Sequence, residues 1–540
     1  MNAHTLDKLE FERITELLAG YAASGLGRGL ALQVRPAHGA GQILAWLEQV
    51  REMLAVEKSM GLPPFAGIRD VRPEVRAAVP PTRLEPEVFA QIAETLQGTH
   101  HVRAWLDALP EEAGRLRHLG ERVGDFLSIA QQISEAVDAR GHVRDEATAR
   151  LARIRGQIIR AKDSIGEVIT KLLHSPQIQK ILQYPNATFH NDRTVLPLKA
   201  EHRGRIQGII HRSSDSGATL FIEPAPVVQL NNQIIKLRYE EHEEITRVLW
   251  QLTQLIHLNR ETILETLNAL AVLDLIGAKV RMARHLRLEV ADLIDEQQIR
   301  LREARHPILL TMPDRRAEEP TEDQEGQGRA AIGRPEPRFE RVVPIDIRVG
   351  DDFDLLVVTG PNTGGKTVTL KTVGLMAAMH QSGLPIPAAP GCKMPVFDDV
   401  LMDVGDEQSL QQSLSTFSSH LGYVLETLRR STPRTLVLID ELGAGTDPDE
   451  GAAIGRAVMD ELLQIGCRAI ITTHLGVLKS RAHTHTRVEN ASVEFDLETL
   501  MPTYRLRIGE AGNSNALAIA QRLGMPKRLV DAAEKHLSDR

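Results

Sequence analysis

Cysteine, aromatic residues and long apolar stretches are all scarce in this 540-residue chain. Its two cysteines, Cys392 and Cys467, are too few for a disulfide framework or a zinc site. No 18 consecutive apolar residues occur without a charge, and the first residues lack the apolar core of a signal peptide. Aromatic residues make up 4%, which argues against a platform that stacks single-stranded bases. These absences predict a cytoplasmic protein that does not cross a membrane.

An overall excess of positive charge is also absent. The net charge is −8 and the pI is about 6.2, which argues against bulk coating of nucleic acid but leaves room for a local basic patch. At this length a single hydrophobic core is not expected, so the chain should divide into two or three domains.

The first part of the chain, from Leu6 to about Ile299, has the pattern of a mostly helical protein. Two stretches place apolar or small residues at alternating steps of three and four, which is typical of a coiled coil. The first comprises Leu151, Ile154, Ile158, Ala161, Ile165, Val168 and Leu172, and the second Leu230, Ile234, Leu237, Ile245, Leu249, Leu252 and Ile256. We expect two long antiparallel helices that pack along these residues.

Between these stretches, within residues 181–225, the pattern changes to short strands at 194–199, 206–211 and 218–222, separated by turn-forming residues. Basic residues outnumber the nearby acidic Asp192 and Glu201. The basic residues are Arg193, Lys199, Arg203, Arg205 and Arg212. They indicate either a solvated hairpin face or a clamp that binds nucleic-acid phosphates.

Residues 315–340 are charged, rich in proline and glycine and poor in apolar residues, which predicts a disordered surface loop. From Val342 onward, strand-like and helix-like stretches alternate. This order predicts a parallel sheet wrapped by helices.

A phosphate-binding loop follows the apolar stretch at 355–359. Residues 360–367 read Gly-Pro-Asn-Thr-Gly-Gly-Lys-Thr, which matches G-x-x-x-x-G-K-[ST] with a strand before it and a helix after it. The backbone N–H groups would surround the phosphates, Lys366 would reach the β and γ phosphates, and Thr367 would bind Mg²⁺. The candidate nucleotide contacts are Gly360, Pro361, Thr363, Gly364, Gly365, Lys366, Thr367 and Val368, and Asn362 joins Lys366 as a candidate catalytic residue.

Two further apolar stretches end in polar residues. Residues 436–439 lead into Asp440 and Glu441, and residues 468–473 lead into His474. Asp440 would hold the Mg²⁺ ion, Glu441 would act as the base for the attacking water, and His474 would sense the γ-phosphate. Each could also be an ordinary strand end or a structural histidine, but their order after the phosphate loop favours ATP hydrolysis.

Hydroxyl groups cluster at residues 413–420, before a helical pattern. They would cap that helix by default, or complete a phosphate site in another subunit. The tight loop at residues 443–448 could also meet a partner subunit.

These motifs resemble the MutS family of ATPases, specifically the bacterial second branch that lacks a mismatch reader. The residues that carry the resemblance are those at 360–368, 415–420 and 440–448. The repair-type form has Met in place of Thr363 and Ser-Thr in place of Thr367-Val368. The resemblance covers essentially the whole chain. It implies a mixed fold, with a helical core and lever domain over 1–299 that carries the β clamp, an ABC-type α/β ATPase domain over 300–515, and a helical dimerisation segment over 516–540.

The resemblance further implies a homodimer that uses ATP and Mg²⁺, with Ser415 of one subunit completing the site of Lys366 and Asp440 in the other. It implies that Tyr504 and Val343 flank the adenine, while Gly509, Gly512 and Ser514 fall in the family's following motif. The lever helices and basic tips would close round branched DNA or dock on a collided ribosome.

Departures from the family narrow the function. Phe11-Glu12-Arg13 is not the Phe-x-Glu mismatch reader, which disfavours mismatch repair. The second branch continues into a Smr nuclease domain, whereas this chain stops at Arg540, so any nuclease activity is expected in sequence beyond it. The first hypothesis is a clamp on branched DNA that restrains homologous recombination, and the second is a ribosome-rescue ATPase. A transporter or chromosome-maintenance ATPase is disfavoured, because the sequence has no Leu-Ser-Gly-Gly signature, membrane span or very long coiled coil.

Overall fold

The computed structural model describes residues 1–191, 193–312, 336–360, 365–404, 413–496, 501–510, 517, 520–521 and 524–538. Over these residues the chain combines many helices with three β-sheets, so the predicted mixed class is confirmed. The predicted disordered loop at 315–340 falls largely outside the described residues. Both cysteines, Cys392 and Cys467, are buried and free. No helix in the described ranges is long and apolar enough to cross a membrane.

The chain forms two compact units that interleave along the sequence. Unit 1 comprises Met1–Pro63, Trp105–Glu121 and Asn268–Arg540, and unit 2 comprises Pro64–Ala104 and Arg122–Leu267. The predicted domain boundary at residue 299 therefore lies inside unit 1. The reason is a shared core, because Leu9 and Phe11 belong to the same buried cluster as Leu356 and Val373.

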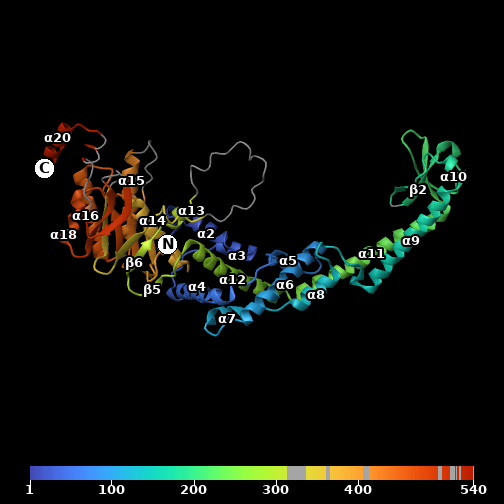
Figure 1. The fold of residues 1–540 in the computed structure, drawn as a ribbon, viewed down its shortest axis with the longest axis horizontal. Helices are drawn as coiled ribbons and strands as arrows, with labels where there is room; N and C mark the ends of the chain where they lie inside the picture. The colour runs from blue at the N-terminus through green and yellow to red at the C-terminus, as the bar shows by residue number, and fades with distance from the viewer. Residues whose placement is uncertain are drawn as a thin grey trace. The chain divides into compact units, whose positions relative to one another are not determined.

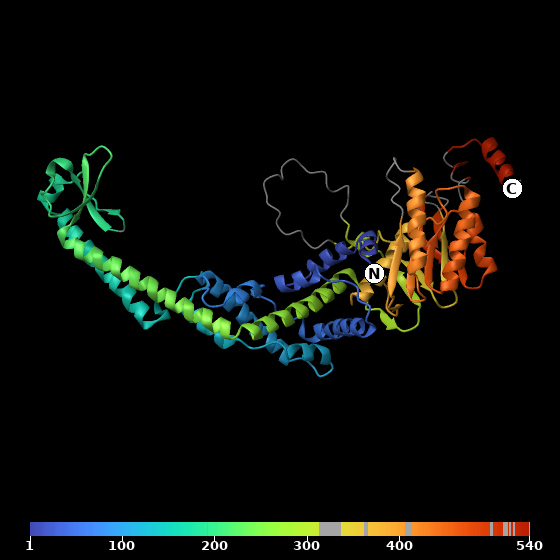
Figure 2. The same cartoon turned by 180° about the vertical axis from the view of Figure 1, so that it is seen from behind.

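Unit 2 is built round two long helices, α9 (Ala149–Leu173) and α11 (Ala225–Leu258), which run side by side in Figures 1 and 2. Ile154 and Ile158 cluster with Leu237, whereas Ile165 clusters with Val227, so the helices are antiparallel as predicted. The other helical elements with residues in unit 2 are α5 (Arg72–Ala77), α6 (Pro86–Asp107), α8 (Leu127–Ala136), η1 (Asp145–Ala147), α10 (Pro176–Ile181), η2 (Ala200–His202) and the start of α12 (Arg260–Leu286).

A four-stranded antiparallel sheet, which we call the clamp sheet, connects α9 to α11. Its order is β1-β2-β4-β3, with β1 (Thr188–His190), β2 (Arg193–Lys199), β3 (Gly208–Ser213) and β4 (Thr219–Pro224). The three predicted strands correspond to β2, β3 and β4, and β1 was not predicted. Leu196, Leu198 and Ile222 pack with residues of α9 and α11 and so hold the sheet on the helices.

Unit 1 contains the ATP-motif region together with the N-terminal helices. Its further helices are α1 (Ala3–Lys8), α2 (Phe11–Ala19), α3 (Gly25–Ala31), α4 (Ala40–Met60), α7 (Gly114–Gly120), α13 (Pro307–Thr311), α14 (Lys366–Gln381), α15 (Ser413–Arg430), α16 (Pro448–Ile465), α17 (Gly476–Lys479), α18 (Arg481–Thr484) and α20 (Lys527–Ser538). A four-stranded sheet has the order β5-β9-β6-β7, with β5 (Asp292–Ile294), β6 (Ile299–Ala304), β7 (Ile345–Val349) and β9 (Lys393–Pro395).

The main sheet of unit 1 has six strands in the order β10-β11-β12-β8-β13-β14. They are β8 (Leu355–Thr359), β10 (Asp399–Asp403), β11 (Thr435–Ile439), β12 (Arg468–Thr472), β13 (Val488–Asp496) and β14 (Met501–Ile508). All neighbours are parallel except β13 and β14, which confirms the predicted parallel sheet. Both faces are apolar, because parallel strands of this kind are covered by helices on both sides.

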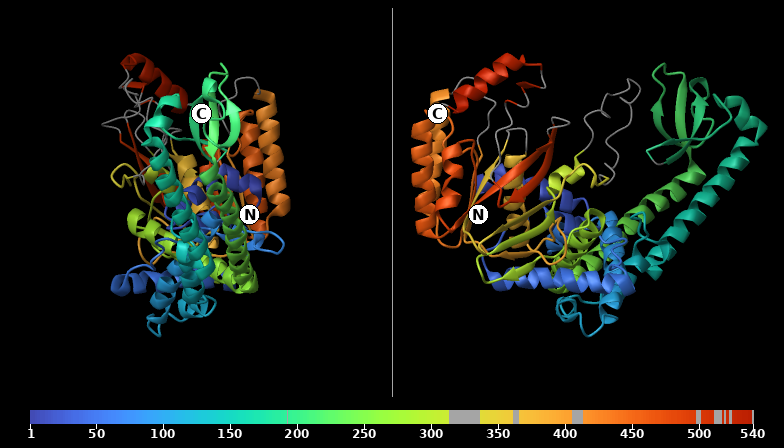
Figure 3. Two further views of the ribbon diagram at one scale, coloured as in Figure 1. Left: turned by 90° about the vertical axis from the view of Figure 1, so that its right-hand side faces the viewer. Right: turned by 60° about the vertical axis from the view of Figure 1, so that its left-hand side comes forward.

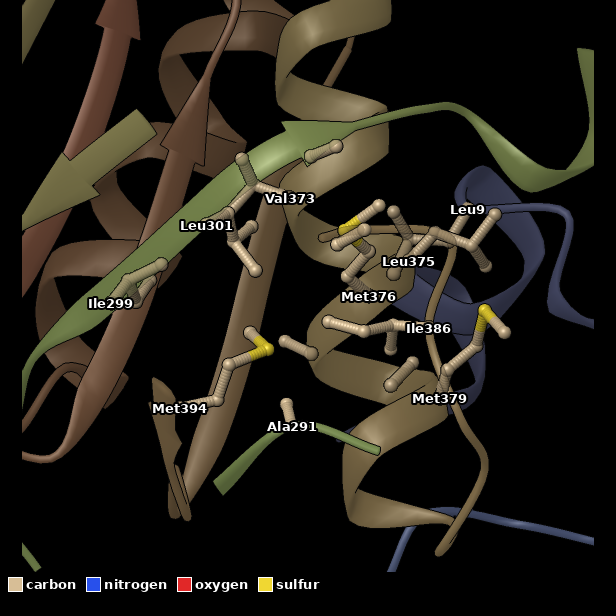
Figure 4. Packing of buried hydrophobic residues seen from close by; sticks show 14 of the residues in the cluster. Leu9, Ala291, Ile299, Leu301, Val373, Leu375, Met376, Met379, Ile386 and Met394 are labelled. Carbon is tan, nitrogen blue, oxygen red and sulfur yellow. The ribbon is translucent and has the colours of Figure 1, made fainter. Parts of the chain in front are cut away.

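Alternate residues of these strands enter two different cores. Leu355, Val437 and Ile471 pack with α15 and α16, which are coloured orange in Figure 3. Leu356, Leu438 and Ile470 belong instead to the large cluster that contains α14. Figure 4 shows part of that cluster, with α14 side chains beside those of β6 and α1–α2. The labelled residues include Leu9, Ile299, Leu301, Val373, Leu375, Met376 and Met379.

Candidate nucleotide-binding site

The predicted motifs meet at one edge of the main sheet. Strands β10, β11, β12 and β8 are neighbours and parallel, so their carboxyl ends lie together. Asp403 ends β10, Asp440 and Glu441 follow β11, His474 comes after β12, and Gly360 follows β8. Ligands of α/β sheets bind at this edge.

The phosphate loop begins at Gly360 and enters α14 at Gly365, both with positive φ angles (140° and 88°) that favour glycine. Lys366 is only 2% exposed, and its Nζ donates to the Gly360 carbonyl at 2.7 Å. The same Nζ lies 3.3 Å from Nε2 of His474. Residues 361–364, which include Asn362, lie outside the described residues.

The candidate metal ligands touch each other. The Thr367 hydroxyl donates to Oδ2 of Asp440 at 2.5 Å, and Asp440 is 5% exposed. The Thr472 hydroxyl donates to the other carboxylate oxygen of Asp440. A hydroxyl and a carboxylate are the oxygen ligands that Mg²⁺ prefers, so the residues present suit that ion.

Glu441 has a left-handed backbone (φ 53°), which is unusual for a residue with a side chain. Its N–H donates to the Thr472 hydroxyl at 2.8 Å, and its Oε1 lies 3.1 Å from Nε2 of His474. This backbone turns the carboxylate of Glu441 toward His474, while Asp440 faces Thr367. Lys366, His474 and Glu441 therefore form one continuous polar chain.

Behind Asp440 lies a second polar pair, Asp403 and His420. Nδ1 of His420 is 2.7 Å from Oδ2 of Asp403, close enough to pair as ions although the angles are poor for a hydrogen bond. Burial acts to lower the pKa of His420, but the Asp403 carboxylate, helped by Asp440 and Glu441, raises it above its ordinary value. The backbone N–H of Asp440 donates to the Asp403 carbonyl at 2.9 Å.

Of the two predicted adenine contacts, Tyr504 lies beside the phosphate loop. A Cβ on Gly365 would come within 2.9 Å of Cδ1 of Tyr504, so the Tyr504 ring rests on the loop. Val343 lines a cavity of about 580 Å³ together with Thr503 and Arg505, the neighbours of Tyr504 in β14. Val368 is 39% exposed on α14, and Gly512 and Ser514 lie outside the described residues.

The two predicted partner-facing segments flank this edge. Ser415 is in the first turn of α15, but its side chain lies outside the described residues. Gly443 has φ 84°, and a Cβ there would lie 2.6 Å from the Gly451 carbonyl, so only glycine permits this close approach. Asp447 then caps α16 by accepting from the N–H groups of Asp449 and Glu450.

The five basic residues of the clamp sheet divide into two groups. Arg193 donates to both carboxylate oxygens of the fully buried Glu223 at 2.9 Å, and Lys199 donates to the Lys180 carbonyl at 3.2 Å. By contrast, the remaining three are exposed and form no ion pair within the described part of the chain. These are Arg203, Arg205 and Arg212, the last lying over the Phe221 ring at 4.9 Å.

Sequence reasoning assigned no role to Thr472, Asp403 or His420. Thr472 is a β-branched residue in an apolar strand, so it resembles an ordinary strand former. Asp403 ends a strand next to β11, and a polar residue at a neighbouring strand end was the available signal. His420 was noted only as the last residue of the hydroxyl cluster.

Comparisons with known proteins agree with these motifs. A family model described as MutS domain V matches residues 356–539. Two relatives called Endonuclease MutS2, from Geobacillus sp. (strain WCH70) and Pelotomaculum thermopropionicum, are each 40% identical over 100% of this chain and 65% of their own length. A third of that name, from Symbiobacterium thermophilum, is 38% identical over 100% of this chain and 64% of its own.

The chain thus spans about 65% of the length of the curated relatives that it matches. The MutS domain V match covers the phosphate loop, the two acidic residues after β11 and the histidine after β12. The whole-chain matches extend the relationship to α9, the clamp sheet and α11. The chain belongs to the MutS family, and the relatives that match its whole length are of the MutS2 type.

Proposed function

We propose that this chain hydrolyses ATP with Mg²⁺ as a homodimer and uses the energy to clamp branched DNA, which restrains homologous recombination. Two sets of contacts carry the proposal. In the first, Asp440 accepts hydrogen bonds from Thr367 and Thr472. In the second, His474 lies between Lys366 and Glu441. These contacts support the proposal because the candidate Mg²⁺ ligands and the candidate base lie at the end of one sheet. The family and the relatives support the same activity.

The residues would divide the reaction between them. Thr367 and Asp440 would hold the Mg²⁺ ion, which neutralises charge on the β and γ phosphates when bound. Lys366 would place its ammonium on the same phosphates. Glu441 would accept the proton of the attacking water, and His474 would orient that carboxylate through the 3.1 Å contact.

The site would be completed by the partner subunit. Ser415 would bring its hydroxyl and the positive N-terminal end of α15 to the partner's γ-phosphate. Asn362 and the other loop residues at 361–364 would surround the phosphates from the same subunit. Tyr504 and Val343 would hold the adenine; the Tyr504 ring next to Gly365 supports the first of these roles.

The clamp sheet would supply the contact with DNA. Arg203, Arg205 and Arg212 are exposed and available to phosphates, whereas Arg193 is engaged by Glu223. The name of the relatives, Endonuclease MutS2, favours DNA over the ribosome as the target. This clamp would act in the cytoplasm.

A comparison of activators tests this proposal. ATP turnover is measured with four-way DNA junctions, linear duplexes of equal length and collided ribosome pairs, all at the same ionic strength. We expect the junction to stimulate turnover most, because clamp closure on DNA should be coupled to the site. Stimulation by ribosomes alone would contradict the DNA proposal and favour a ribosome-rescue ATPase.

A further inference from the structure

If the chain is the homodimer proposed above, helix α15 carries residues that act in two different subunits. Its first turn carries Ser415, whose proposed role is in the partner's nucleotide site. Five residues later, about 7.5 Å along the helix axis, His420 contacts Asp403 of its own subunit. One helix thus connects Ser415, with its proposed role on the partner, to a residue held at its own sheet edge.

The own-subunit contact leads directly to the candidate metal ligand. The Asp403 carboxylate is 8% exposed and the His420 ring 18%, with 2.7 Å between Oδ2 and Nδ1. Asp403 pairs with Ile439 in the β10–β11 register, and its carbonyl accepts from the N–H of Asp440 at 2.9 Å. Only Asp403 therefore separates His420 from the residue that would bind Mg²⁺.

The charges round His420 make the contact specific. Carboxylates face it from two elements, Asp403 at the end of β10 and Asp440 with Glu441 after β11. Removing the imidazole would leave the Asp403 carboxylate buried without its counter-ion, which is costly. The Nε2 atom of His420 is buried and has no hydrogen-bond partner within the described part of the chain.

We infer that His420 is a positioning residue that couples the two composite ATP sites of the dimer. It ties the helix that presents Ser415 to the partner's nucleotide to the strand end that presents Asp440 and Glu441 to its own. When Ser415 engages the partner's γ-phosphate, α15 cannot shift without moving Asp403 or breaking the buried pair. Binding in one site thereby sets the position of the carboxylates in the other.

Mixed dimers with a single active site test the coupling. One chain carries Glu441→Gln together with His420→Ala, and the other is wild type, so the remaining active site uses the wild-type carboxylates and the variant chain's Ser415. We expect kcat at this site to fall about tenfold, with KM for ATP nearly unchanged, relative to the dimer in which Glu441→Gln stands alone. His420→Gln, which keeps an N–H for Asp403, should recover most of the rate.

Two controls distinguish a failure of the composite site from a failure of the proposed coupling by His420. Leu425→Ala removes a 45%-exposed side chain from the same helix and should leave kcat unchanged. Ser415→Ala in the same arrangement tests the composite site itself, and no effect there would contradict the proposed homodimeric mechanism. If Ser415→Ala slows the site while His420→Ala and His420→Gln leave it at the full rate, the composite site stands and the coupling role of His420 is overturned.

Discussion

At the scale of single residues, the Thr472 hydroxyl contacts both acidic residues of the site, the side chain of Asp440 and the backbone of Glu441. It donates to Asp440 and at the same time accepts from the backbone N–H of Glu441 at 2.8 Å. The first bond orients a proposed Mg²⁺ ligand, and the second stabilises the left-handed backbone that turns Glu441 toward His474. Residues behind metal ligands often matter nearly as much as the ligands themselves.

Substitution of Thr472 by Val should therefore weaken Mg²⁺ use without disturbing the strand, because the two side chains have the same shape. We expect the Mg²⁺ concentration for half-maximal ATP turnover to rise roughly tenfold. Thr473→Val is the matched control, since its buried hydroxyl donates to the Leu442 carbonyl at 3.0 Å and accepts from the Leu475 N–H at 3.1 Å, two backbone groups outside the proposed metal ligands. Equal Mg²⁺ dependence in the two variants would show that Thr472 does not support the metal site.

At the scale of elements, the clamp sheet uses its basic residues for two purposes. Glu223 of β4 accepts from Arg193 and Asn231 and contacts His211 at 2.7 Å, so these residues hold the sheet together. Despite its burial, these partners keep the pKa of Glu223 below its ordinary value, so the carboxylate stays charged. The exposed arginines remain for a partner: Arg203 and Arg205 lie between η2 and β3, and Arg212 lies in β3.

Neutralising the exposed arginines should weaken DNA binding and its salt dependence together. For the Arg203→Gln, Arg205→Gln and Arg212→Gln triple variant, we expect the slope of log Kd against log salt to decrease by about one unit per lost phosphate contact. The control replaces three exposed basic residues of α9, Arg153, Arg160 and Lys162, by Gln. An unchanged slope in the clamp variant, or an equal loss in the α9 variant, would contradict a contact confined to the clamp sheet.

Elements with a regular spacing of apolar residues could be predicted from the sequence, and the exceptions to the spacing have physical causes. Leu151, Ile154 and Ile158 are buried in α9 as their spacing predicts. Glu244 breaks the rule in α11, because it is 1% exposed and held by Thr148 and Arg247. Thr148 is the N-cap of α9, and Arg247 lies one turn further along α11. Hydropathy alone would therefore have placed Glu244 at the surface.

Contacts between residues far apart in the sequence were also not predictable in the nucleotide site and the clamp sheet. The phosphate loop and the two strand ends follow from local sequence, since each motif is continuous. The ion pair between Arg193 and Glu223 joins residues 30 positions apart, and that between Asp403 and His420 joins two different elements. Charge counting along the chain cannot distinguish such paired residues from free ones.

At the scale of the whole molecule, α14 links the nucleotide site to α12, a helix with residues in both compact units. Lys366 begins α14, and at its other end the carbonyls of Ser382 and Gly383 accept from Nζ of Lys279, on α12. Lys279 is buried, and burial lowers its pKa to about 7. A cation at a helix C-terminus is favourable, but here it carries a desolvation cost.

This buried lysine should make stability depend on pH. Between pH 7 and 10.5 the unfolded chain binds the proton that folded Lys279 has released, so the free energy of unfolding should rise with pH. The expected slope from this group is at most ~1.4 kcal/mol per pH unit.

Chemical denaturation across that range checks the expectation. Lys279→Met should lose this part of the slope, whereas Lys236→Met, at a side chain that is 79% exposed, should keep it. The same pH dependence in both variants would contradict a deprotonated, buried Lys279.

The most direct test of the account is the turnover of a Glu441→Gln variant. If Glu441 is the base, the variant should bind ATP and Mg²⁺ like the wild type while steady-state hydrolysis falls at least about 100-fold. Glu461→Gln, at an exposed position of α16, should hydrolyse ATP at the wild-type rate. Equal ATP turnover by Glu441→Gln and the wild type would contradict the assignment of this sheet edge as the hydrolytic site.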